Sequence, residues 1–238
     1  MDGFSYYNIF ATKGIEYIAI IAFLLLLIPF WIVLHHPVQS LRPIREALSR
    51  LTANILNIPQ GLFYSKNHAW TYLEPSGTAK VGLDDLLLKI VGPVQVQYLR
   101  EPGEFILKGE PMTIIRQKGK SLRIPAPVSG TLTDTNPMVV QESGILNEDP
   151  YDRGWLCRIK PADWVTETRS YYLAEEATQW ATRELIRLKD FLAVSLQKNA
   201  VDPSMVVLQE GGELRMNPLS ELQPEVWQDF QQEFLSQP

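Results

Sequence analysis

Apolar residues are unevenly spaced along the 238-residue chain, and their spacing divides it into segments. The longest apolar run, YIAIIAFLLLLIPFWIVL at residues 17–34, contains no charged residue. As a helix it would extend about 27 Å, close to the roughly 30 Å hydrocarbon core of a bilayer. Tyr17 and Trp31 stand near its ends, where aromatic side chains favour the membrane interface. The run predicts one transmembrane helix at residues 17–34, after an N-terminal segment at residues 1–16.

The residues flanking this run predict its type and its orientation. A cleaved signal peptide is the alternative, but it needs a basic start and a small-residue cleavage site, which the sequence lacks. Only Lys13 precedes the run, whereas Arg42, Arg45 and Arg50 follow it. Positive residues favour the cytoplasmic side. We therefore expect a single-pass protein of the inner cell membrane, with its C-terminal domain in the cytoplasm.

Residues 35–60 carry a helical pattern. Apolar residues recur there at steps of three and four: Leu41, Ile44, Leu48, Leu51, Ile55 and Ile58. The spacing predicts an amphipathic helix over residues 38–58. It could lie on anionic lipid headgroups or pack on the domain that follows, and the sequence does not decide between the two.

Residues 61–164 are β-rich. Prolines and glycines separate short runs of strand-forming residues: AWTYL, VQVQYL, PMTIIRQ, GTLTD and WLCRIK. Twelve basic residues balance twelve acidic ones in this part of the chain. A compact β domain is expected here.

Residues 165–238 return to helix and are acidic, with six basic and twelve acidic residues. An apolar stripe predicts a helix over residues 168–198, the Gly-Gly of MVVLQEGGELRM predicts a hairpin, and a short helix is expected near residues 225–235. The predicted fold class is therefore α+β: a transmembrane helix, a β-rich domain and a helical C-terminal extension with a short hairpin.

Composition excludes several classes of protein and of site. A mean hydropathy of −0.08 argues against a polytopic membrane protein, and a net charge of −5 argues against nucleic-acid binding. The only cysteine, Cys157, lies in an alternating strand pattern with no nearby histidine, so we expect a buried, inert thiol. His35 and His36 fit interfacial anchoring, and His68 a structural role.

No enzyme or metal site emerges from the titratable residues. The acid pairs Asp84-Asp85 and Glu148-Asp149 lack a histidine or third acid at metal-ligand spacing, so they are predicted to be surface turn residues. No nucleophile, base and orienting residue can be combined. We therefore expect a protein that is not an enzyme.

Several motifs in the β-rich segment resemble one known family. They are NHAW from Asn67, VGLDD from Val81, IPAPVSG from Ile124 and NEDPYDRGW from Asn147, together with glycines at positions 92, 103 and 109. In order and spacing, residues 61–164 resemble the H protein of the glycine cleavage system, a lipoyl carrier of the biotinyl/lipoyl hammerhead type. The resemblance implies a flattened sandwich of short strands, with a carrier lysine on a tight hairpin.

At the carrier position the chain departs from this family. The resemblance places the lipoyl-lysine seven residues before Ala126, and that residue here is Gly119. Lys118 and Lys120 flank it, but neighbouring residues on a strand face opposite ways, so either could be modified only if the turn were reshaped. We expect no cofactor, with lipoate on Lys118 or Lys120 as the alternative.

The expected hairpin is basic instead. Residues 111–133 contain no acid and four positive side chains, which are Arg116, Lys118, Lys120 and Arg123. They predict a docking patch for an acidic partner surface or for anionic lipid headgroups, or a plain solvated turn.

The sequence thus predicts a non-enzymatic, membrane-anchored accessory or assembly subunit. Its partners would be the bilayer and other protein subunits of a membrane complex. A respiratory or redox complex is one such class, and no residue specifies it. Trp180, Trp227 and Phe230 could be anchor points for a partner or core residues.

Overall fold

The computed structural model describes residues 10–35, 50–142, 144–199, 202–203, 206–207 and 212–236. The chain forms two units, residues 1–46 and residues 47–238. The described residues of the first unit form the helix α1, at Phe10–His35, which includes Pro29.

The predicted transmembrane helix is wrong. Among the described residues, no helix has both the length and the apolar character needed to cross a bilayer. The side chains described in α1, from Tyr17 to Trp31, are all exposed. The membrane location rested on that span and stays a prediction.

The helix expected over residues 38–58 lies largely outside the described residues. Where the chain is described again, Arg50–Leu51 form a strand, β1, and Ala53–Ile55 form a 3-10 helix, η2. Strand β1 pairs with β11 at Leu214–Arg215. This partner lies far along the chain, which a local helical period cannot reveal.

The second unit is built on short antiparallel strands, as expected. They are β2 (Phe63–Tyr64), β3 (Ala69–Leu73), β4 (Ala79–Leu83), β5 (Gln95–Tyr98), β6 (Phe105–Ile106), β7 (Pro111–Gln117), β8 (Lys120–Pro125), β9 (Gly130–Thr135) and β10 (Trp155–Pro161). One sheet has the order β2-β3-β4-β10-β9-β6 and the other the order β5-β7-β8. The side chains of β7 largely alternate between buried and exposed, the period of a strand with one face on the core.

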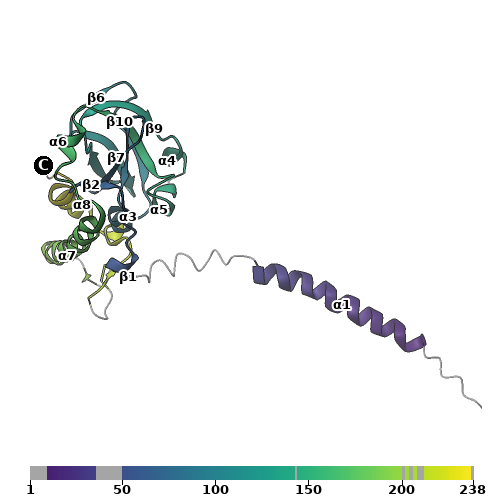
Figure 1. Cartoon of the computed structure of the whole chain (residues 1–238). Coiled ribbons are helices and arrows are strands. Elements are labelled where there is room, and N and C mark those ends of the chain that lie inside the picture. Colours follow the sequence, from purple (N-terminus) through teal and green to yellow (C-terminus); the bar gives the residue numbers. More distant parts are fainter. Residues whose placement is uncertain are drawn as a thin grey trace, which may run out of the picture. The chain divides into compact units, whose positions relative to one another are not determined.

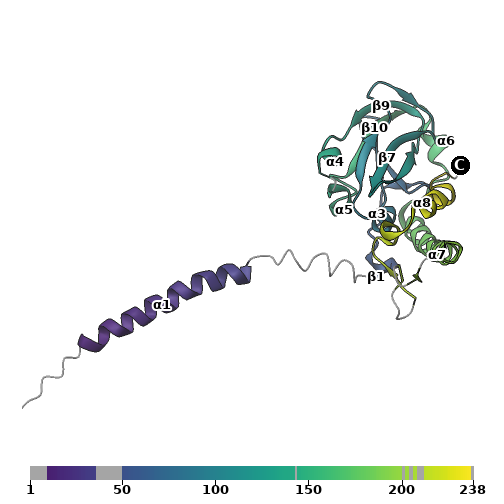
Figure 2. The same ribbon diagram turned by 180° about the vertical axis from the view of Figure 1, so that it is seen from behind.

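Helices occupy the connections and the C-terminal extension. They are α3 (Asp85–Val91), α4 (Met138–Gln141), α5 (Ile145–Glu148), α6 (Trp164–Thr168), α7 (Ala174–Lys198), the 3-10 helix η4 (Pro218–Glu221), α8 (Pro224–Phe230) and the π-helical segment η5 (Gln231–Leu235). Figures 1 and 2 view the molecule from opposite sides, and both place α7 beside α8 at one end of the strands. Of the predicted hairpin, Val207 bridges to Leu214.

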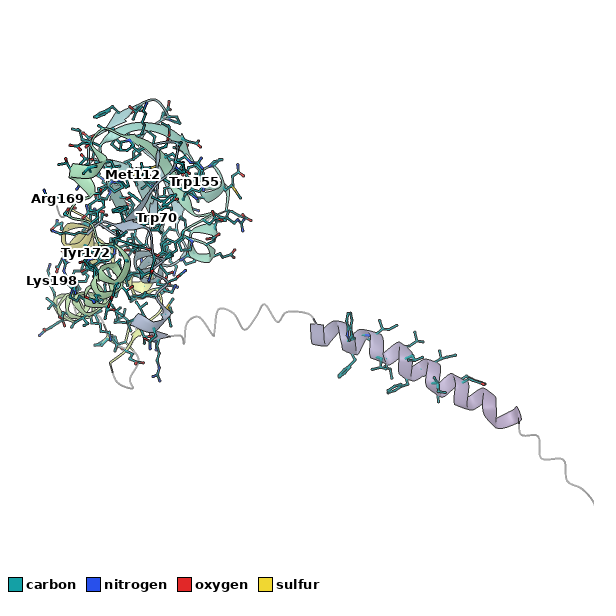
Figure 3. The ribbon with its side chains drawn as sticks, viewed as in Figure 1. Trp70, Met112, Trp155, Arg169, Tyr172 and Lys198 are labelled. Carbon is teal, nitrogen blue, oxygen red and sulfur yellow. The ribbon has the colours of Figure 1, made fainter. Side chains whose placement is uncertain are left out.

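The extension completes the hydrophobic core and is not an appendage. Trp180, Trp227 and Phe230 are 4%, 1% and 0% exposed, so they are core residues and not free anchors. Trp227 and Phe230 belong to the same buried cluster as Ile115 of β7. In Figure 3, Trp70 and Met112 lie within the β-rich body, whereas Lys198 lies at the end of α7.

Candidate functional site

The hairpin that joins β7 to β8 is the candidate site. Gln117 pairs with Lys120, which leaves Lys118 and Gly119 as the two turn residues. Both have positive φ, 46° and 80°. Positive φ at both central positions is the pattern of a type I′ turn, in which glycine is favoured because it has no Cβ.

Gly119 lies at the tip because the backbone needs it and not because space is short. A Cβ built at this position would meet no atom within 4 Å. A side chain at position 119 would thus project into open space. The position expected for the carrier lysine therefore has room for one, but it holds no amine.

The side chain of Lys120 is held by the C-terminal extension. Its Nζ donates to the backbone oxygens of Ser220, at 2.7 Å, and Leu222, at 2.8 Å. It also lies 5.1 Å from the ring centroid of Trp227, a cation–π contact. Partial burial lowers the pKa of Lys120, and the neighbouring Lys118 lowers it further, against the opposing effect of Glu221.

Lys118 contacts the same extension from the other side of Gly119. Its Nζ lies 2.9 Å from Oε1 of Glu221, although both side chains are more than half exposed. Through this hydrogen bond and its charge, Lys118 lowers the pKa of the Glu221 carboxyl. An ion pair this exposed contributes little stability.

Arg116 and Arg123 complete the predicted basic group, and both side chains are exposed. The backbone of Arg123 is paired with Gln231: its N–H donates to Oε1 at 2.6 Å, and its carbonyl oxygen accepts from Nε2 at 3.1 Å. The structure therefore brings all four predicted residues to one hairpin. It also shows what the sequence missed, which is that the extension contacts three of them.

These side chains do not fit a lipoyl group at the expected position. Attachment needs a lysine amine at the turn, and Gly119 has none. The amine of Lys120 is enclosed by two carbonyls and an indole, and that of Lys118 is paired with Glu221. Within the described part of the chain, no group of three His, Cys, Asp or Glu side chains could hold a metal ion.

A second polar cluster is buried where the residues that precede β3 and α3 meet helix α7. Nδ1 of His68 lies 2.9 Å from Oδ2 of Asp84, and its Nε2 lies 3.7 Å from Oε1 of Glu184. His68 and Asp84 are 0% exposed and Asp85 is 3% exposed, so the prediction that Asp84-Asp85 are surface turn residues is wrong. Asp84 caps α3 by accepting from the N–H of Leu87 at 2.7 Å, which is a structural role.

Burial opposes a charge on His68, but its two acidic neighbours outweigh it. Burial alone would lower the pKa, whereas the Asp84 carboxylate and then Glu184 raise it to about 9. Glu184 also receives a hydrogen bond from Arg187 at 2.8 Å. The expected structural role of His68 therefore takes the form of a buried ion pair that joins the turn between β2 and β3 to α7.

Cys157 is buried as expected. Burial raises the pKa of its thiol to about 12, and Sγ lies 3.6 Å from Sδ of Met112. A thiol that stays protonated in an apolar setting is a poor nucleophile.

Comparison with known proteins identifies the domain. The family model described as glycine cleavage H-protein matches residues 62–184. A glycine cleavage system H protein from Paraburkholderia phymatum is 32% identical over 114 residues, which cover 48% of this chain and 90% of that protein.

Two further relatives come from thermophiles. A glycine cleavage system H protein from Thermus thermophilus is 33% identical over 108 residues, or 45% of this chain and 84% of that one. The glycine cleavage system H protein 2 of Aquifex aeolicus is 28% identical over 134 residues, or 56% of this chain and 83% of that one. With the strands, turns and buried motif residues described above, these matches show that the chain belongs to the glycine cleavage H-protein family.

Proposed function

We propose that this chain is a non-enzymatic member of the family whose H-protein-like domain docks other protein subunits and does not carry lipoate. The observation that carries the proposal is Gly119, which stands at the tip of the β7–β8 hairpin with φ of 80°. The chain keeps the hairpin, its register and its turn, and lacks the amine that a carrier needs at this position.

The contacts of the neighbouring lysines support the same proposal. A carrier arm must leave the turn freely, whereas the amine of Lys120 is bound by two carbonyls of the extension. Modification there would remove the charge and leave a single amide N–H in place of an ammonium that donates to both carbonyls. The hairpin is better suited to present a fixed surface than a mobile arm.

Intact mass tests the absence of a carrier group. The full chain would be produced in cells that lipoylate their own carrier proteins, and one of those carriers would be measured from the same cells as the control. We expect the hairpin peptide to be unmodified while the control carries lipoate. A lipoyl adduct on Lys118 or Lys120 contradicts the proposal.

Co-purification tests the docking function. The full chain, purified gently from its native cells, is expected to retain defined protein partners. A double variant, Arg116→Glu with Arg123→Glu, should lose them, whereas Arg183→Glu on the exposed face of α7 should not. A chain that remains monomeric, or partners that ignore the double variant, would contradict docking through the hairpin.

The alternative function is a lipoyl carrier that uses Lys118 or Lys120. One observation favours it for Lys118, whose side chain is 62% exposed and lies next to the tip. The same mass measurement decides, since Lys118→Arg would then abolish the adduct and Lys120→Arg would not.

A further inference from the structure

The C-terminal extension covers one flank of the hairpin and reaches Lys118 at its turn. On that flank Lys120 meets Ser220, Leu222 and Trp227, and Arg123 meets Gln231. On the other flank the hairpin faces the chain that leads from α3 into β5. There the surface forms a hollow of about 430 Å³.

Hydrogen bonds hold the residues that line the hollow in place. Nε2 of Gln117 donates to the backbone oxygens of Val91, at 2.8 Å, and Pro93, at 2.9 Å. Gln95 pairs with Arg116 in the β5–β7 register. These contacts within the chain therefore fix the position of the hairpin relative to β5 without a partner protein.

The charged groups of the hollow are all positive. Its lining consists of Pro93, Val94, Gln95, Arg116, Gln117, Lys118, Gly119, Lys120 and Ser121. No acid is among them, and Arg116 has no ion pair with any described residue. The planar guanidinium of arginine matches a carboxylate in a two-point hydrogen bond.

The extension already shows which chemistry the turn accepts. Glu221 places a carboxylate 2.9 Å from the amine of Lys118. The chain thus satisfies one cation of the hairpin with an acid of its own and leaves Arg116 for another group.

We propose that this hollow, with Arg116 as its principal contact, binds carboxylate side chains of an acidic segment of a partner protein. The inference rests on the proposed docking function and specifies the chemistry of the partner. Charge complementarity carries it, since no acid lines the hollow and Arg116, unlike Lys118 and Lys120, has no described partner for its charge.

Binding of a defined acidic peptide tests the proposal. The probe is a fluorescein-labelled peptide of alternating Glu and Ser residues, titrated with the full chain at low salt and followed by anisotropy. Removing one exposed charge contact weakens binding by up to about fivefold, so Arg116→Gln should have an effect of that size and Arg116→Glu a larger one. Arg183→Gln is the matched control on α7 and should bind like the unchanged protein.

Several outcomes would overturn the inference. One is that Arg116→Gln binds the peptide as tightly as the unchanged protein does. Another is that a peptide with Gln in place of Glu binds as tightly as the acidic peptide. A third is that high salt does not weaken the binding. Phosphatidylserine vesicles form a further arm, and binding to them but not to the peptide would assign the hollow to lipid headgroups. If the chain stays unlipoylated and keeps its partners while the peptide fails to bind, the inference is wrong and the proposed function stands.

Discussion

At the scale of single residues, His68 is an unusual position. It is fully buried, has φ of 59°, and lies between Asp84 and Glu184. A buried charge is tolerated only when it is paired, and removing one partner of a buried pair leaves the other charge buried and unpaired. The acids on both sides of His68 provide that pairing.

The pKa of His68 gives stability a pH dependence of known sign. Its folded value is raised from 6.5 to about 9, so the stabilisation is complete below about pH 6.5 and is lost as the pH rises through about 9. The effect is on the order of 3 kcal/mol. Denaturant unfolding followed between pH 6 and pH 10 should show a decline in the free energy of unfolding across that window.

The variant His68→Asn isolates the charge from the backbone. Asparagine tolerates positive φ, so the turn is retained while the imidazolium is lost. We expect lower stability at pH 7 and a flatter pH profile. An unchanged profile in the variant would assign the pH dependence to another group.

The thiol of Cys157 should be unreactive while the protein is folded. Because burial raises the pKa of its thiol to about 12, the folded protein should react negligibly with a thiol reagent at pH 8. It should react fully once it is unfolded in denaturant. Rapid labelling of the folded protein would show that the thiol is reached from solvent.

At the scale of elements, two glycines of the β domain serve different purposes. Gly119 has φ of 80° and open space around it, whereas a Cβ at Gly130 would lie 2.2 Å from the backbone oxygen of Lys160 on β10. Glycine is needed at position 119 because of the backbone conformation. It is needed at position 130 because two strands approach closely there.

These two glycines make a matched pair of variants. Gly119→Ala should cost about 1 kcal/mol, from backbone strain alone. Gly130→Ala should cost more, about 3 kcal/mol, because strand β9 must move away from β10. Thermal unfolding of both variants checks the order, and equal losses would mean that the strands separate easily.

Elements with a local signal were the predictable ones. The runs AWTYL and PMTIIRQ form β3 and β7 with the expected bounds, because strand alternation and turn residues are properties of short windows. The pairing of β1 with β11 and the partners of Lys120 were not predictable, since each contact joins residues more than a hundred positions apart or involves backbone oxygens. A basic hairpin could be read from the sequence, but the segment that covers one of its flanks could not.

At the scale of the whole molecule, the extension and the β domain share one core. After Asn217 the described chain buries Pro218 and seven other apolar side chains: Leu219, Leu222, Val226, Trp227, Phe230, Phe234 and Leu235. At 1.5–3 kcal/mol each, they contribute at most about 10–20 kcal/mol. Removing them would expose the rest of that shared core to water.

A chain ended at Asn217 should therefore fail to fold cooperatively. Circular dichroism during heating would show a broad, non-cooperative change in place of a sharp transition. The milder variant Trp227→Ala should fold but lose about 3–5 kcal/mol. A truncated chain that melts like the full one would show that the family domain is stable by itself.

The contact between Gln231 and Arg123 has a consequence for association between copies. Strand β8 is the last strand of its sheet, and an edge strand exposes N–H and C=O groups to which another chain can add. The side-chain amide of Gln231 bonds both backbone groups of Arg123, as a neighbouring strand would. One glutamine thus satisfies both backbone groups of Arg123, so a strand from another copy finds neither group free at that point of the edge.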